Sequence, residues 1–267
     1  MFGNVSLFIS SLFINVIFLF ENILLKFKHF LKTNTVVIAY DFGAVVANIC
    51  INNFPNDEQG NKMRNKISKL LLICPTIGGI PMTLRDYFSG NGILDPNIIQ
   101  DYHSVLLSMP NKKLYDLPVA IFNSLSYNAN SISELLKEEN KPVDLFKELM
   151  MLQNLSLKNP GVPCIFVTNN EQQTPICYNY KNNLKEKPEM YKPLNNNKLP
   201  TTDIHNNGMH EGLQSLGDGI VPFENIQKII QEWNKSQNNC YLEIIKDKDH
   251  FTILKSYELA LVIVSNL

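Results

Sequence analysis

The chain has 267 residues, a formal net charge of -1 and a hydrophobic content of 45%. Because α/β folds often reach about 250 residues as one unit, we expect a single domain over residues 1–267. The hydrophobic content excludes a wholly disordered chain. The near-zero net charge argues against a nucleic-acid-binding protein, because neutralising phosphates requires a basic face.

The first 34 residues are mostly apolar, and we interpret residues 6–32 as one long helix. Its most apolar part, residues 7–20, is shorter than the ~20 residues that a membrane span prefers. No Lys or Arg precedes that part, although a signal peptide begins with basic residues. A buried or interfacial helix, an uncleaved anchor and a signal peptide therefore all remain open. Membrane association or the secretory pathway is the localisation that this segment favours.

Four short runs rich in β-branched and other apolar residues predict buried strands. They are residues 36–40, 70–74, 163–168 and 241–245. Helices are predicted at residues 44–52, through most of 83–157, at 223–233 and at 252–264. Residues 181–216 are polar and Asn-rich, which is typical of a long solvated loop. Strands that alternate with helices predict an α/β fold with a mostly parallel sheet and a helical cap inserted at about residues 83–157.

The cysteines form no recognisable metal-binding pattern. No two of the five stand in a C-x-x-C pair, so no structural zinc site is predicted. We expect no metal ion and no other cofactor. An odd number of scattered cysteines leaves the redox compartment open. They are Cys50, Cys74, Cys164, Cys177 and Cys240.

The turn after the first predicted strand has the layout of a nucleophile elbow. That motif is G-x-S-x-G, in which small residues flank a nucleophile on a strained strand-to-helix turn. Here the five positions read Ala39-Tyr40-Asp41-Phe42-Gly43, so small residues hold both ends and Asp41 holds the nucleophile position. Taken alone, this turn is more typical of an aspartate that caps a helix.

Two later motifs complete a possible triad. The segment Gly217-Asp218-Gly219 follows the third predicted strand, and His250 follows the fourth. Taken alone, the first is an ordinary Gly-Asp-Gly turn and the second a surface histidine on a polar loop. Nucleophile, acid and histidine in this order, each after a strand, are the arrangement of an α/β-hydrolase. Asp41, Asp218 and His250 are therefore the candidate catalytic residues, and we expect their side chains to meet.

Several ordered segments over about residues 35–255 resemble the lecithin:cholesterol acyltransferase-like family. This family includes phospholipid:sterol and phospholipid:diacylglycerol acyltransferases and lysosomal phospholipase A2. The similar segments are the elbow at residues 37–48, Pro75-Thr76-Ile77-Gly78-Gly79, Thr83-Leu84-Arg85, Ser89-Gly90-Asn91, Pro160-Gly161-Val162-Pro163-Cys164, Thr174-Pro175 with Tyr178, Gly217-Asp218-Gly219-Ile220-Val221 and His250-Phe251-Thr252-Ile253-Leu254. The resemblance implies an α/β-hydrolase fold that acts on acyl esters of glycerophospholipids. It also implies phospholipid or sterol lipid as ligand, contact with a membrane surface and no cofactor.

The chain departs from the family pattern in four respects. Asp41 replaces the family's serine, and Tyr40 replaces its usual histidine. The family has further strands and a P-G-x-x-G-S segment, which supplies part of the oxyanion site, before the elbow. Only about thirty-five residues precede it here, so residues 36–40 are expected to form an edge or near-edge strand, and the chain is expected to associate with detergent or membrane. Cys164 stands where the family often has a disulfide cysteine, but the partner position near Ile229 has none.

An aspartate at the elbow changes the chemistry that the site can perform. Acyl transfer needs a hydroxyl that His250 deprotonates while Asp218 orients the imidazole. A carboxylate that attacked an ester would form a mixed anhydride and collapse back to substrate. Three interpretations follow: an acyltransferase or phospholipase, an impaired member that retains lipid or partner binding, and a hydrolase with an aspartate nucleophile, as in dehalogenases and epoxide hydrolases. The second is favoured over a working acyltransferase, and a truncated gene model is a separate alternative.

Overall fold

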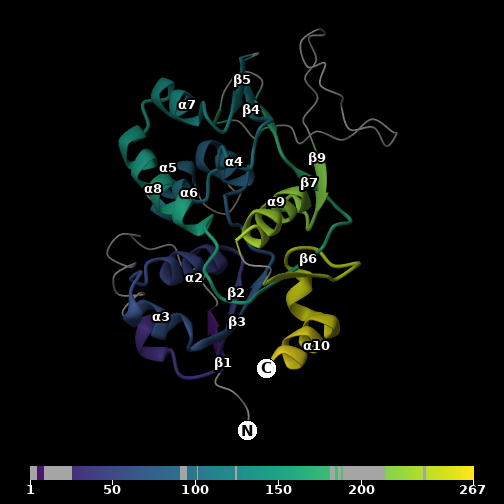
Figure 1. Cartoon of the computed structure of the whole chain (residues 1–267). Helices are drawn as coiled ribbons and strands as arrows, with labels where there is room; N and C mark the ends of the chain where they lie inside the picture. The colour runs from purple at the N-terminus through teal and green to yellow at the C-terminus, as the bar shows by residue number, and fades with distance from the viewer. Residues whose placement is uncertain are drawn as a thin grey trace.

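The computed structural model describes residues 5–8, 26–90, 95–100, 102–123, 125–180, 184–185, 188, 214–236 and 239–267, with the backbone alone at 5–8 and 214. Within these residues, the main sheet has five strands in the order β1-β2-β3-β6-β10, and every neighbouring pair is parallel (Figure 1). The strands are β1 (Val5–Phe8), β2 (Thr35–Tyr40), β3 (Ile67–Ile73), β6 (Cys164–Thr168) and β10 (Cys240–Ile244). The predicted α/β architecture with a mostly parallel sheet is confirmed.

Side chains that alternate along the strands build two apolar layers, one on each face of the sheet. On β2, Val37 and Ala39 belong to the larger cluster, whereas Val36 and Ile38 belong to the smaller one. Successive residues of a strand point to opposite faces, so a run without polar residues buries both faces. This accounts for the nearly complete burial of β2.

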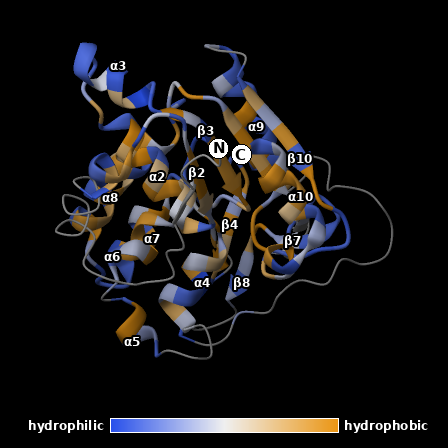
Figure 2. Cartoon of the chain, turned by 90° about the horizontal axis from the view of Figure 1, so that it is seen from below, coloured by the Kyte–Doolittle hydropathy of each residue, from blue (hydrophilic) through white to orange (hydrophobic). Residues whose placement is uncertain are grey.

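Helices cover both faces of the main sheet (Figures 1 and 2). The larger cluster includes Ile49, Leu149 and Ile226, from helices α2, α8 and α9 respectively. The smaller cluster includes Leu259 of α10 and Ile253 of the 3₁₀ helix η1. The bounds are α2 (Phe42–Asn52), α3 (Glu58–Arg64), α8 (Val143–Ser156), α9 (Phe223–Asn234), η1 (Thr252–Lys255) and α10 (Tyr257–Asn266).

The predicted helical region at residues 83–157 contains strands as well as helices. Its helices include α4 (Met82–Ser89), α5 (Pro96–Ile99), α6 (His103–Leu107) and α7 (Ile132–Glu138). Strands β4 (Pro118–Phe122) and β5 (Leu125–Asn128) join β8 (Tyr178–Tyr180) in a second sheet of order β5-β4-β8. The prediction of a mainly helical cap therefore missed these strands. β4 and β5 form an antiparallel hairpin, and β4 also pairs with β8 about sixty residues away, a partner that local periodicity does not report. Figure 1 shows β4, β5 and α7 at the end of the molecule opposite the two termini.

The predicted polar loop at residues 181–216 ends in a strand. β9 (Gln214–Gly217) pairs antiparallel with β7 (Gln172–Pro175), so the prediction was wrong for its last three residues. Most of the rest of that segment lies outside the described residues. The pairing brings the chain back beside the end of β6, which determines where Asp218 lies.

The prediction of one long helix over residues 6–32 was wrong at its beginning. Val5–Phe8 forms β1, which pairs with Val36–Ala39 of β2. Residues 26–30 are helical, and residues 9–25 lie outside the description. A short apolar run fits a strand as well as a buried helix, so periodicity alone did not distinguish them. β2 is thus near the edge, as predicted, but it has a partner strand on each side.

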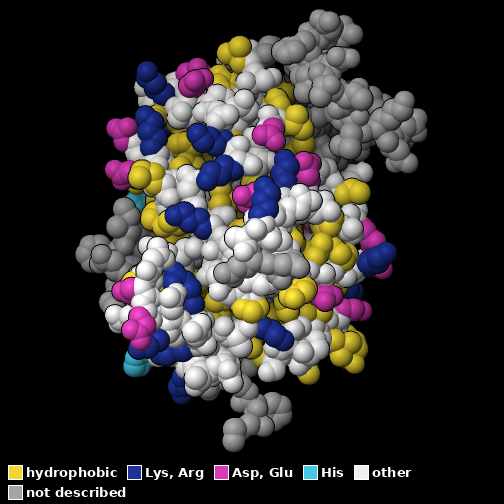
Figure 3. Space-filling model, viewed as in Figure 1, with side chains coloured by type: hydrophobic (Ala, Val, Ile, Leu, Met, Phe, Trp, Pro, Cys, Tyr) yellow, Lys and Arg dark blue, Asp and Glu magenta, His cyan; other side chains and the backbone are white. Residues whose placement is uncertain are grey.

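Two features of the described residues bear on membrane contact and surface charge. Among the described residues, no helix is both long and apolar enough to cross a membrane. On the face shown in Figure 3, Lys and Arg side chains are interspersed with Asp and Glu side chains. This mixture agrees with the net charge of -1.

Candidate functional site

Asp41 occupies a strained turn between β2 and α2. Its backbone has φ 52° and ψ -126°, and its side chain makes no capping hydrogen bond to α2. The alternative interpretation of Asp41 as an ordinary helix cap is therefore wrong. A non-glycine residue with this backbone conformation is energetically unfavourable and persists only where its surroundings impose it. The backbone N–H of Asp41 donates to the carbonyl oxygen of Ile73 at 3.0 Å, which ties the turn to the end of β3.

Two glycines shape the loop that carries Asp218. A Cβ on Gly217 would lie 2.1 Å from the carbonyl oxygen of Val221, and Gly219 has φ +95°. Neither position accepts a larger residue without distortion. The backbone N–H of Gly219 donates to Thr174 Oγ1 at 2.9 Å, so β7 holds the loop from the other side. The Gly-Asp-Gly segment is consequently a tight loop that holds its acid in one place.

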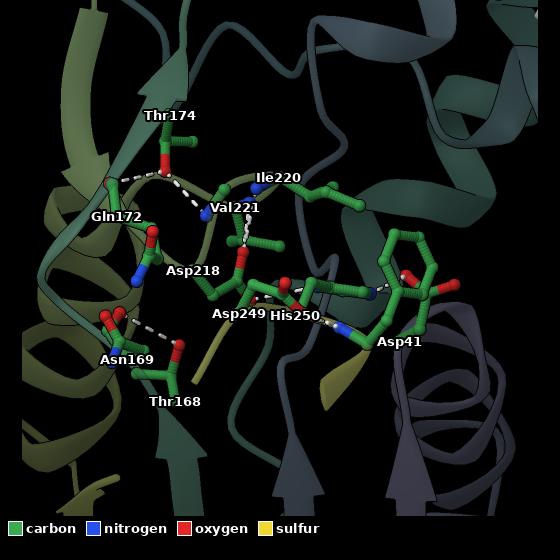
Figure 4. A network of polar contacts seen from close by, with 12 residues as sticks. Asp41, Thr168, Asn169, Gln172, Thr174, Asp218, Ile220, Val221, Asp249 and His250 are labelled. Atoms are coloured by element: carbon green, nitrogen blue, oxygen red, sulfur yellow. Dashed lines mark hydrogen bonds and ion pairs between the residues drawn. The ribbon is translucent and has the colours of Figure 1, made fainter. Parts of the chain in front are cut away.

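The carboxylate of Asp218 is fully buried and accepts several hydrogen bonds (Figure 4). Its Oδ1 accepts from the backbone N–H groups of Ile220 at 2.9 Å and Val221 at 2.7 Å. Its Oδ2 lies 3.0 Å from His250 Nδ1. Backbone donors offset the cost of burying a charge, so the loop presents an anion to His250.

His250 lies on a short loop between β10 and η1. The preceding residue, Asp249, organises this loop, because its Oδ1 accepts from the backbone N–H groups of Phe251 at 2.9 Å and Thr252 at 2.7 Å. The imidazole is 2% exposed, and its Nε2 lies 3.5 Å from Asp41 Oδ1. Figure 4 shows the ring between Asp218 and Asp41. The three side chains therefore meet, as the sequence predicted, although their roles in catalysis remain a proposal.

The main sheet is parallel, and the strained elbow, the acid and the histidine follow its strands in this order along the chain. This combination identifies the fold. The chain has an α/β-hydrolase-like fold. The fold alone does not determine a reaction, because function depends on the groups at the site.

The imidazole of His250 lies between two carboxylates, which favours its protonated form. Burial lowers the pKa of His250, but the hydrogen bonds and negative charges of Asp218 and Asp41 outweigh burial and raise it from 6.5 to about 9. His250 is therefore an imidazolium near neutral pH. A protonated ring has no free lone pair at Nε2, so it does not act as a base in this state.

Two further residues lie beside the triad, and the sequence analysis did not predict their position. The hydroxyl of Tyr40 donates to the backbone carbonyl of His250 at 3.1 Å, and the two rings lie 5.2 Å apart. The thiol of Cys74 is fully buried, and its sulfur lies within 4.8 Å of side-chain atoms of Asp218 and His250. Burial and the charge of Asp218 raise the pKa of Cys74 well above its usual value. The sequence offered one signal for these contacts, which is position. Tyr40 is the last residue of predicted strand 36–40, and Cys74 is the last residue of predicted strand 70–74.

Three donor atoms at the triad are close enough together to hold a metal ion. Cys74, Asp218 and His250 each offer one ligand atom, and these atoms lie within 4.8 Å of one another. Thiolate, carboxylate and imidazole are ligands that Zn²⁺ accepts. The same atoms already satisfy one another, since Asp218 Oδ2 is the partner of His250 Nδ1. An ion at this position would have to replace that hydrogen bond.

Known proteins resemble this chain in structure at low sequence identity. No family model matches the chain, and no curated protein matches its sequence. The chain is similar to the crystal structure of the Tle4–Tli4 complex, with 12% identity and a TM-score of 0.49 over 82% of this chain and 54% of the other. It is also similar to two crystal structures of the rice cell wall degrading esterase LipA from Xanthomonas oryzae, one of which is a ligand-bound form. Both LipA structures have 12% identity and a TM-score of 0.39 over 92% of this chain and 61% of theirs. The chain thus spans 54% to 61% of the length of these proteins.

Proposed function

We propose that this chain is a lipid-binding relative of the lecithin:cholesterol acyltransferase-like enzymes and phospholipases, in which acyl transfer is lost at Asp41. One observation carries the proposal. The elbow presents a carboxylate to His250 Nε2, at 3.5 Å, where an acyl-transfer enzyme presents a hydroxyl. The ordered sequence segments that resemble this family point to glycerophospholipid or sterol lipid as the ligand.

Two physical effects argue that acyl transfer is lost. The carboxylate of Asp41 has no proton to give, and the mixed anhydride that it would form with an ester reverts to substrate. Beside the carboxylates of Asp41 and Asp218, His250 has a pKa of about 9 and carries a proton, so it does not act as a base in this chain. Removing a triad nucleophile leaves at most ~10³–10⁴-fold of catalysis over water. Lipid binding does not depend on either group.

An apolar stripe on α10 supports contact with a membrane surface. Tyr257, Leu261 and Val264 are exposed by 72%, 50% and 69%, and their spacing places them on one side of the helix. Phe251, just before η1, is also exposed by 66%. Amphipathic faces of this kind bind membranes in proportion to the apolar area that they bury. We therefore propose that a lipid surface covers this stripe.

Vesicle flotation with a lipid analysis tests both parts of the proposal. The full chain is incubated with phosphatidylcholine vesicles, and we expect it to float with them while no fatty acid is released. Leu261→Glu should weaken flotation several-fold, whereas Lys235→Glu, on another exposed surface, should not. Flotation that neither variant changes would contradict the role of α10. Fatty-acid release that disappears in His250→Ala would contradict the loss of acyl transfer.

An aspartate-nucleophile hydrolase is the second candidate, and a specific observation favours it. The side chain of Asp41 is 35% exposed on a strained elbow and makes no capping bond, so one carboxylate oxygen is accessible to a substrate. Asp41 would attack a saturated carbon, expel halide or open an epoxide, and form an ester. That ester would neutralise Asp41 and remove one charge that raises the pKa of His250. The imidazole could then lose its proton and activate a water that hydrolyses the ester.

Turnover and intermediate trapping distinguish this candidate from lipid binding. Styrene oxide and a 1-haloalkane are offered to the wild-type chain, and product is measured with Asp41→Asn as control. Two results together would establish the aspartate nucleophile. The wild type would form product while Asp41→Asn would not, and His250→Ala would accumulate a covalent adduct on Asp41. Absence of product and adduct, with vesicle binding intact, would leave the lipid-binding proposal.

A further inference from the structure

Cys164 and Cys240 are directly paired across two neighbouring parallel strands. Each is the first residue of its strand, β6 and β10 respectively, and the strand register places one opposite the other. Neighbouring strands lie ~4.8 Å apart, which falls within the ~4.4–6.8 Å between Cα atoms that a disulfide spans. Both side chains belong to the larger apolar cluster, so they point to the same face of the sheet.

Both cysteine side chains are buried. Cys164 is 0% exposed and Cys240 6% exposed. The Cys164 thiol donates to the carbonyl oxygen of Val162 at 3.2 Å, and the Cys240 thiol donates to Asn239 Oδ1 at 3.5 Å. The neighbouring Cys164 lowers the pKa of Cys240, whereas burial raises the pKa of Cys164 well above its usual value. Cys240 is the more accessible of the two sulfurs, and the thiolate is the form that attacks a disulfide.

Two asparagines hold the first residue of β10 in place. Asn234, at the end of α9, accepts from the backbone N–H of Cys240 at 2.9 Å and donates to its carbonyl oxygen at 3.1 Å. The backbone N–H of Cys164 donates to the carbonyl oxygen of Asn239 at 2.9 Å. These bonds keep Cys240 opposite Cys164 although Cys240 begins its strand.

We propose that Cys164 and Cys240 are a disulfide-forming pair that a low-molecular-weight disulfide oxidises. The family resemblance directs attention to a partner for Cys164 near Ile229, where there is no cysteine, whereas the register of β6 and β10 supplies Cys240. The other three cysteines lie on other elements: Cys50 in α2, Cys74 directly after β3 and Cys177 directly before β8.

The proposed reaction is two successive thiol–disulfide exchanges. The Cys240 thiolate attacks one sulfur of the small disulfide, and the first small thiolate leaves and takes up a proton. The Cys164 thiolate then attacks the sulfur of Cys240, and the second small thiolate leaves and is protonated. The chain loses two protons and two electrons, and the small disulfide is reduced to two thiols.

The bond would tie β10, an edge of the main sheet as described, to its neighbour. It closes a loop of about 75 residues, which restricts the unfolded chain. Asp41 and His250 follow the carboxyl ends of β2 and β10, whereas the cysteine pair lies at the amino ends of β6 and β10. The bridge should therefore raise resistance to unfolding without changing the geometry of the triad.

Peptide mapping of the wild-type chain tests the pairing directly. Full-length protein purified in reducing buffer is incubated with excess oxidised glutathione, and free thiols are blocked with N-ethylmaleimide under denaturing conditions. After proteolysis, mass spectrometry should find one peptide pair that joins Cys164 to Cys240 and disappears on reduction. Two blocked thiols at these positions, or a different pairing in the folded protein, would overturn the proposal.

Urea unfolding with matched variants gives a second measurement. Oxidation should move the midpoint to a higher urea concentration in the wild type and in Cys50→Ser, and reduction should reverse the shift. Cys240→Ser should show no such shift. If Cys240→Ser fails to fold, the mapping of the wild type still decides the pairing. An equal shift in Cys240→Ser would contradict the bridge.

Discussion

Two hydrogen-bonding contacts connect His250 with Asp218. The backbone N–H of His250 donates to the backbone carbonyl of Asp218 at 2.7 Å, and His250 Nδ1 lies 3.0 Å from Asp218 Oδ2. The first contact positions the loop and the second orients the ring. Because the backbone bond does not depend on the carboxylate, a substitution that removes the charge of Asp218 should leave the loops together. The charge and the position of this residue can therefore be tested separately.

Asp218→Asn should lower the pKa of His250 and reduce stability. The substitution removes one of the two charges that raise the pKa, and it disturbs a buried hydrogen bond. We expect a loss of about 1–3 kcal/mol in the free energy of unfolding, measured by urea denaturation. Asp116→Asn is the control, because Asp116 forms an exposed ion pair with Lys228 and should cost less than about 1 kcal/mol. Equal losses in the two variants would contradict the assigned role of Asp218.

Asp41→Asn should also lower the pKa of His250 from its value of about 9, because it removes the second carboxylate. NMR titration of the imidazole resonances measures this change. His29, which is exposed on the helical segment at residues 26–30, serves as the internal reference. A His250 titration that is identical in the wild type and the variant would show that Asp41 does not pair with the ring.

Stability should decrease as the pH rises from about 6.5 to about 9. The folded pKa of His250 is higher than the unfolded value near 6.5, so the contribution of its charge is fully present below pH 6.5. Above that pH the unfolded chain loses the proton first, and the contribution is lost as the pH rises through the folded pKa. The decrease should be on the order of 2–3 kcal/mol in the wild type and smaller in Asp41→Asn. Urea denaturation at several pH values checks this, and a rise in stability over the same range would refute the ion pair.

Asp41→Ser should restore little esterase activity. The serine would meet a histidine with a lowered pKa, so the proton acceptor would be available. Each donor of an oxyanion site contributes ~2.7–4 kcal/mol to the transition state, and the family segment that supplies part of that site has no counterpart in this sequence. Release of fatty acid from a soluble p-nitrophenyl ester measures the outcome. A rescue of a hundredfold or more would show that the donors are present.

Gly217→Ala should displace the acid loop. The added methyl group would lie 2.1 Å from the carbonyl oxygen of Val221 and 2.7 Å from Thr174 Oγ1. Overpacking of this kind costs about 1–3 kcal/mol, and movement of Asp218 should change the pKa of His250. Ser215→Ala, on the same strand, is the matched control. Unchanged stability and an unchanged His250 titration in Gly217→Ala would contradict the tight loop.

The main strands β2, β3, β6 and β10 and the identity of the triad candidates could be predicted from the sequence. Uninterrupted apolar runs report burial on both faces, and this information lies within a few residues. The order of Asp41, Asp218 and His250 along the chain likewise needs no coordinates. The same local signals did not separate β1 from a helix, and they did not reveal the hairpin of β4 and β5 or the distant pairing of β4 with β8.

The distances between groups that lie far apart in the sequence depend on strand order and register. The sequence places Asp41 more than two hundred residues before His250, and their 3.5 Å separation follows from the parallel order of β2, β3, β6 and β10. The same order puts Cys240 opposite Cys164. The order and register of the strands are set by the packing of the whole sheet. Side-chain periodicity carries no information about which strands become neighbours. For this reason the meeting of Asp41, Asp218 and His250 could be predicted only through their α/β-hydrolase order along the chain, whereas the pairing of Cys164 with Cys240 could not be predicted.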